Sequence, residues 1–140
     1  MNPVTSRSSM FHSRLPELRR AREFLERFCE GAGIERGAGL KLNLVVEELF
    51  LNTVKHGHRG GADAPVWVTV SSDESGIHLA YEDQAPPFNP FAAGARELLE
   101  ALAETRREGG LGVLLAHGLT RASEYAYLYG RNRIRLTLAA

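Results

Sequence analysis

The sequence predicts an α+β fold, a two-layer sandwich in which helices cover one face of a mostly antiparallel sheet. Two helical patterns come first in the chain, and the alternation of apolar and polar residues typical of strands follows them. The strands come in adjacent pairs rather than alternating with helices, which favours this class over a parallel sheet. A chain of 140 residues with 44% hydrophobic residues predicts one domain with one core, over residues 14–140.

Composition excludes several classes of protein. The 17 basic and 17 acidic residues cancel, so no overall charge points to nucleic acid as a direct partner. The single cysteine, Cys29, excludes an internal disulfide framework and a cysteine-based zinc site. No run approaches the roughly 18 apolar residues of a membrane span, and the N-terminus has no apolar signal core. We therefore expect a cytoplasmic protein with no membrane contact.

The helical patterns occupy the first part of the chain. Residues 1–13 are polar, and we expect either a flexible terminus or a weak edge strand there. Apolar residues recur at helical spacing from Leu15 to Cys29, with Pro16 tolerated in the first turn. A second helix is expected from Ala38 to His56, stopping at Gly57, where a left-handed C-terminal residue fits.

Two strand pairs follow. "VWVTVSS" and "GIHLAYED", joined by "DESG", predict an antiparallel hairpin whose second strand ends at Asp83, where prolines crowd the chain. Residues 95–108 have helical composition, and "GGLG" precedes a short apolar helix, "VLLAHGL". The chain closes with "SEYAYLY", a turn at "GRN" and "RIRLTLA", which predict a second antiparallel hairpin.

A polar stripe interrupts the second helix, which is otherwise apolar almost all round. It consists of Lys41, Val45, Glu48, Asn52 and Lys55. Glu48 and Asn52 are four residues apart and so are neighbours on one helical face. The stripe is either a strip of helix surface that touches solvent or the floor of a pocket. In the pocket, Glu48 could accept a proton and Asn52 could supply an oxygen to Mg²⁺.

Two further features have the same two interpretations. Asp83 is either a polar strand end or a carboxylate that accepts a hydrogen bond from an exocyclic amino group, as adenine would offer. The glycines of "GGLG", Gly109, Gly110 and Gly112, are either a flexible helix entry or a source of backbone N–H groups for a phosphate. Each feature alone favours the structural interpretation, and their combination favours the functional one.

In this order, "EELFLN", "EDQAPPF" and "GGLG" resemble the N, G1 and G2 boxes of the GHKL ATPases. The pattern is most similar to the anti-sigma-factor serine kinases of that superfamily, and the likeness covers about residues 15–138. The matching residues are Glu48, Asn52, His56, Gly57, Asp83, Pro87, Phe88, Pro90, Gly109, Gly110, Gly112, Gly130, Arg131, Asn132 and Arg133.

The resemblance implies a Bergerat-type fold that binds ATP and Mg²⁺ between the helix carrying Glu48 and a lid within Phe91–Glu108. It implies that Glu48 is the catalytic base, that Asn52 binds the metal and that Asp83 binds the adenine amino group. The implied nucleotide-binding set is Asn52, His56, Asp83, Ala85, Phe88, Gly109, Gly110, Leu111 and Gly112.

Two positions depart from the family pattern. Ala85 stands where the pattern has glycine, and Asn89 stands where it has an acid after Phe88. A methyl group at position 85 would either crowd the base or resist a positive φ, and both effects would weaken ATP binding.

The resemblance implies a serine/threonine-protein kinase that transfers the ATP γ-phosphate to a STAS-type antagonist and regulates a sigma factor by partner switching. A sigma factor and a second copy of the chain are the further partners it suggests. The alternative is a non-catalytic module of the same fold, in which nucleotide occupancy decides whether a regulatory partner is held.

Overall fold

The computed structural model describes residues 5–57, 63–89 and 120–139, and in them it has the predicted α+β architecture. The strands are β1 (Thr5–His12), β2 (Pro65–Asp73), β3 (Gly76–Asp83), β4 (Thr120–Leu128) and β5 (Arg131–Leu138). They form one antiparallel sheet in the order β1-β2-β3-β5-β4. The helices are α1 (Leu18–Ala32) and α2 (Arg36–Asn52), with a 3-10 turn, η1 (Leu15–Glu17), before α1 and a π-helical turn, η2 (Thr53–Gly57), after α2.

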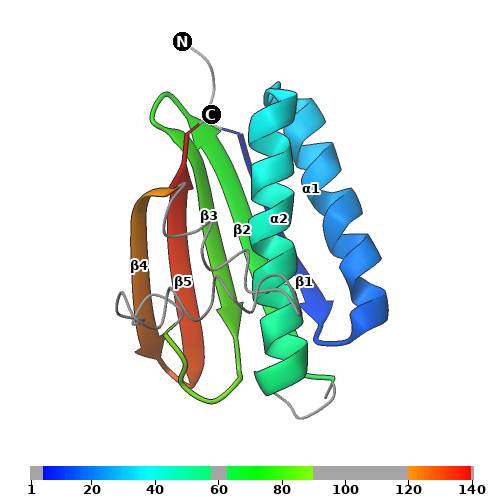
Figure 1. The fold of residues 1–140 in the computed structure, drawn as a ribbon, viewed down its shortest axis with the longest axis vertical. Helices are drawn as coiled ribbons and strands as arrows, with labels where there is room; N and C mark the ends of the chain where they lie inside the picture. The colour runs from blue at the N-terminus through cyan, green and yellow to red at the C-terminus, as the bar shows by residue number, and fades with distance from the viewer. Residues whose placement is uncertain (1–4, 58–62, 90–119, 140) are drawn as a thin grey trace, which may run out of the picture.

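Both helices lie on the same face of the sheet, over its β1 and β2 side (Figure 1). The core lies between the two layers because alternate strand residues point toward the helices. Its fully buried members include Phe11, Leu25, Phe28, Leu42, Val46, Phe50, Val66, Val68, Val70, Ile77, Leu79, Tyr81, Leu136 and Leu138. Within the described ranges, neither helix is long and apolar enough to cross a membrane. The helices predicted over 95–108 and 113–119 lie outside these ranges.

The N-terminal segment forms an edge strand. Of the two alternatives for residues 1–13, the structure has this one for Thr5–His12, which pair along their whole length with β2. Phe11 is buried and packs edge-on against Phe24 of α1, with ring centroids 5.8 Å apart. The buried carboxylate of Glu17 in η1 accepts a hydrogen bond from the His12 backbone N–H at 3.1 Å. The strand is therefore attached to the helical layer as well as to the sheet.

The second helix ends earlier than the sequence predicts. We expected an α-helix as far as His56, but α2 ends at Asn52 and the chain continues as the π-helical turn η2. The Thr53 hydroxyl lies 3.0 Å from the carbonyl of Leu49, one turn back, and such back-bonding bends helices. Single π-helical turns frequently mark functional sites.

The β2–β3 turn requires glycine. Gly76 has φ +133°, and a Cβ on it would lie 2.2 Å from the carbonyl oxygen of Leu138. No other residue fits without moving the end of β5. The predicted "DESG" hairpin is confirmed at this position.

The β4–β5 turn is placed one residue earlier than predicted. Tyr129 and Gly130 form it, with φ values of 53° and 75°, as in a tight two-residue hairpin turn. The predicted second hairpin and the place of Gly130 in its turn are confirmed, but Arg131 and Asn132, also predicted in the turn, already belong to β5. This register brings Asn132 directly opposite Asp83 of β3.

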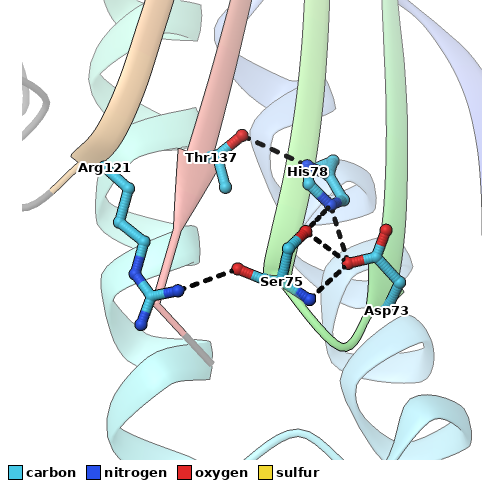
Figure 2. Close-up of polar contacts among 5 residues, drawn as sticks. All are labelled: Asp73, Ser75, His78, Arg121 and Thr137. Carbon is cyan, nitrogen blue, oxygen red and sulfur yellow. Dashed lines mark hydrogen bonds and ion pairs between the residues drawn. The ribbon is translucent and has the colours of Figure 1, made fainter.

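Polar side chains also support the β2–β3 turn on the outer face of the sheet (Figure 2). Asp73 Oδ1 accepts hydrogen bonds from the Ser75 hydroxyl at 2.6 Å and the Ser75 backbone N–H at 2.8 Å. The same oxygen lies 2.9 Å from Nε2 of His78, whose Nδ1 lies 3.1 Å from the Thr137 hydroxyl. The Ser75 hydroxyl is the largest cause, and His78 the next, of a pKa of about 2 for Asp73.

Asp73 should therefore make folding stability depend on pH in acid. Its pKa in the folded state is below the usual value of 3.8, so its contribution is present above about pH 3.8. That contribution is lost as the pH falls through about 2. Asp73→Asn should flatten the dependence of the melting temperature on pH in this window, measured by circular dichroism. Glu74→Gln, in the same turn, is the control, and an unchanged slope in Asp73→Asn would contradict the assignment.

Candidate functional site

The Asp83 carboxylate lies at the end of β3, on the face of the sheet that carries the helices. Asp83 is in phase with Leu79 and Tyr81 and is only 6% exposed. Its carboxylate accepts three hydrogen bonds from the residues that the structure describes. They come from the Thr53 hydroxyl at 2.8 Å, the Asn132 side-chain amide at 2.9 Å and the Ala85 backbone N–H at 3.2 Å. A buried carboxylate is thus held from a helix end, a neighbouring strand and its own loop.

The hydroxyl groups of Tyr81 and Thr53 form a hydrogen-bonded chain that connects the core to Asp83. The Tyr81 hydroxyl lies 2.6 Å from the Thr53 hydroxyl oxygen. Burial raises the pKa of the Tyr81 phenol well above its usual range, so it stays a donor near neutral pH. Thr53 has one proton for two acceptors, the Leu49 carbonyl and Asp83, and the charged acceptor forms the stronger bond. Thr53 therefore donates to Asp83, and the Tyr81 hydroxyl has two acceptors, the Thr53 oxygen at 2.6 Å and the Leu49 carbonyl at 3.1 Å.

The opposite side of the carboxylate is bound from β5. Asn132 is 3% exposed, and its Nδ2 donates to Asp83 Oδ1. The Asn132 Oδ1 accepts a short hydrogen bond from the hydroxyl of Tyr125 in β4. Burial also raises the pKa of the Tyr125 phenol, which keeps this donor protonated.

The carboxylate has room for one more hydrogen bond. Asn132 and Ala85 both donate to Oδ1, and Thr53 donates to Oδ2. Each carboxylate oxygen accepts about two hydrogen bonds, so the donors in residues 5–57, 63–89 and 120–139 leave one acceptor position, on Oδ2. A single N–H donor of a ligand could occupy it.

Glu48 and Asn52 lie one turn apart near the end of α2, and both are half-buried. Asn52 is followed directly by Thr53, the residue that binds Asp83, so the end of α2 and the end of β3 are joined. The predicted stripe is not uniformly solvent-facing, because Val45 in its middle is 1% exposed. The neighbouring Glu47 points elsewhere and forms an ion pair with Arg22 of α1 at 2.8 Å.

The side chains do not form a complete metal site by themselves. In the part of the chain that the structure describes, no group of three or more His, Cys, Asp or Glu residues could hold an ion. Asn52 offers one neutral amide oxygen, one helical turn after Glu48. Mg²⁺ usually takes one or two ligands from protein and the rest from substrate phosphates and water, so this set fits a metal that arrives with a nucleotide.

The comparison with known families decides the identity of the domain. Residues 11–138 match the model of the histidine kinase-like ATPase domain. The chain belongs to this family. Membership of an ATPase family implies nucleotide binding. The buried Asp83 carboxylate is a candidate contact for that nucleotide.

A solved structure supports the fold of this histidine kinase-like ATPase domain. The crystal structure of the RsbU and RsbW domains of Rv1364c from Mycobacterium tuberculosis matches with a TM-score of 0.63 at 15% identity. The match covers 98% of this chain and 33% of that one, so the domain spans about a third of the length of that protein. No curated protein matches the sequence.

Two of the predicted site residues, Ala85 and Phe88, follow Asp83 in the described part of the domain. Ala85 is buried and does not have a positive φ, because Tyr129 is the only non-glycine residue in the described ranges that does. The expected backbone strain at the glycine-to-alanine departure is therefore absent. Phe88 is 62% exposed, and its backbone N–H donates to the Tyr125 hydroxyl and to the Asn132 side-chain oxygen.

The structure describes the remaining predicted site residues only in part or not at all. His56 falls within η2, and the structure describes its backbone only. Outside the described residues are Gly109, Gly110, Leu111, Gly112 and the lid within Phe91–Glu108.

Four residues of the hydrogen-bond network around Asp83 carried no predicted role in the site: Thr53, Tyr81, Tyr125 and Asn132. Asn132 had a signal, because it is in phase with the buried Ile134, Leu136 and Leu138. A polar residue on the buried face of a strand needs a hydrogen-bond partner, and Asp83 is that partner.

Proposed function

We propose that this ATPase domain is a serine/threonine-protein kinase of the anti-sigma-factor type. It binds ATP with Mg²⁺ and transfers the γ-phosphate to a serine or threonine of a STAS-type antagonist, and so regulates a sigma factor by partner switching. The observation that carries the proposal is the buried Asp83 carboxylate. It accepts three hydrogen bonds from described residues, which leave one acceptor position, and Thr53 joins it to the helix of Glu48 and Asn52.

Asp83 selects adenine by the direction of the hydrogen bond. The 6-amino group of adenine is a donor and satisfies the open position on Oδ2. Guanine has a carbonyl oxygen at that position, which would face a carboxylate with no proton between them. A buried polar group without a hydrogen-bond partner loses its hydration with no compensating interaction. The site should therefore reject guanine strongly.

Glu48 and Asn52 serve the phosphate end of the nucleotide. Asn52 supplies an oxygen to Mg²⁺, and Glu48 accepts the proton of the attacking hydroxyl. When bound, Mg²⁺ neutralises charge on the phosphates, and phosphoryl transfer depends mainly on such charge neutralisation and positioning. The backbone of Gly110 and Gly112 is assigned to the phosphates from the sequence resemblance alone.

Calorimetry of the purified protein tests the binding step. ATP should bind more tightly with Mg²⁺ than with a chelator present, because Asn52 is neutral and the metal depends on the phosphates for charge. GTP should bind much more weakly than ATP under both conditions. Absence of binding at millimolar ATP would overturn the proposal.

Transfer of labelled γ-phosphate to the cognate STAS-type antagonist tests the catalytic step. The label should appear on a serine or threonine of the antagonist only when both proteins are present. Tight ATP binding without transfer to any antagonist would overturn the kinase and favour the non-catalytic, nucleotide-gated module.

A further inference from the structure

Asn132 binds the proline-rich loop after β3 as well as Asp83. Its Nδ2 lies 3.0 Å from the carbonyl oxygen of Ala85 and 3.1 Å from that of Pro86. Its Oδ1 accepts from the backbone N–H of Phe88 at 3.0 Å. One buried side chain therefore contacts the loop at three positions besides the carboxylate.

Two residues of this loop cannot donate a backbone hydrogen bond. Pro86 and Pro87 have no N–H groups, so these two positions cannot continue the pairing of β3 with β5 through backbone amides. The Asn132 amide replaces that pairing. Its orientation is determined, since Nδ2 faces three oxygens and Oδ1 faces two donors, Phe88 N–H and Tyr125 O–H.

We propose that Asn132 is the positioning residue of the nucleotide site. Together with the Ala85 N–H it occupies both acceptor positions of Asp83 Oδ1, which leaves Oδ2 as the oxygen that receives the base. It also fixes the loop that follows the carboxylate. The inference rests on the proposed function of Asp83 and adds the residue that determines which oxygen of Asp83 is presented.

The test compares two nucleotides in wild-type and variant proteins. Purine riboside triphosphate differs from ATP only by lacking the 6-amino group, so the ratio of the two affinities reports the Asp83 contact. Wild-type protein should prefer ATP. Asn132→Ala should reduce this preference roughly tenfold, since hydrogen bonds to charged groups are worth about this factor or more. A residue with a purely structural role would weaken both nucleotides equally.

Two further variants make the test decisive. Tyr125→Phe removes the hydroxyl that donates to Asn132 and accepts from the Phe88 N–H at 3.1 Å, and it should reduce the preference in the same direction by a smaller factor. It decides the matter if Asn132→Ala does not fold. Thr137→Val, on the outer face of the same strand, removes a contact to His78 and should leave the preference unchanged.

The outcomes distinguish the role of Asn132 from the proposed function of the domain. A wild-type preference retained in both Asn132→Ala and Tyr125→Phe would overturn the role of Asn132 alone. Wild-type protein that binds neither nucleotide would overturn the proposed function and this inference with it.

Discussion

Glu48→Ala is expected to slow phosphoryl transfer by roughly 10²- to 10⁴-fold while leaving ATP affinity close to that of the wild type. The reason is that Glu48 is assigned to the proton of the attacking hydroxyl rather than to the nucleotide. Asp83 and Asn52 hold the nucleotide in the proposed site, and both remain in this variant. Single-turnover transfer to the antagonist measures the rate, and calorimetry measures the affinity.

Glu47→Ala is the matched control for this prediction. Glu47 is the preceding residue of α2, but its carboxylate pairs with Arg22 on the helical surface. Exposed ion pairs of this kind contribute about 0–1 kcal/mol, so the control should fold and should transfer phosphate at the wild-type rate. Transfer that survives in Glu48→Ala would show that the base has been assigned to the wrong residue.

Asp83→Asn should weaken ATP binding by roughly 10- to 100-fold. The amide has the shape of the carboxylate but one acceptor oxygen instead of two. Its NH₂ group would face either the Thr53 hydroxyl or the Asn132 amide, both of which donate to Asp83. The charge-assisted hydrogen bond to the adenine amino group would be lost as well. Calorimetry gives the affinity, and a thermal melt shows how much of the effect comes from lower stability.

The control for Asp83 is its neighbour on the same strand. Glu82 points to the opposite face of the sheet, 3.9 Å from the Arg131 guanidinium, so Glu82→Gln changes the same charge without entering the site. We expect its ATP affinity to equal that of the wild type. Equal affinities for Asp83→Asn and Glu82→Gln would place the nucleotide elsewhere.

The sequence predicts those parts of the fold that depend on local periodicity. The alternation in β2 and β3 gave the first hairpin, and the prolines gave the end of β3 at Asp83. Helical spacing gave α1 because one face of it is buried. In these segments the residues that decide the structure are close neighbours in the chain.

The rest depends on partners that are distant in the chain. The polar residues of β1 form a strand because β2, more than fifty positions later, supplies the hydrogen bonds. The β4–β5 turn was misplaced because Tyr129 takes a positive φ that asparagine or glycine usually occupies. Asn132 then read as a turn residue, and its role became visible only when the pairing of β5 with β3 placed it opposite Asp83.

The hydrogen bond between Asp83 of β3 and Asn132 of β5 has a consequence for ligand affinity. Asp83 and Asn132 are 49 positions apart, and each belongs to a different hairpin. Bringing two residues so distant in the chain together costs conformational entropy, and the chain loses that entropy when it folds rather than when a ligand arrives. The carboxylate is therefore preorganised. If the base binds at Asp83 as proposed, it meets an acceptor already oriented, and its binding energy is not spent on ordering the chain around it.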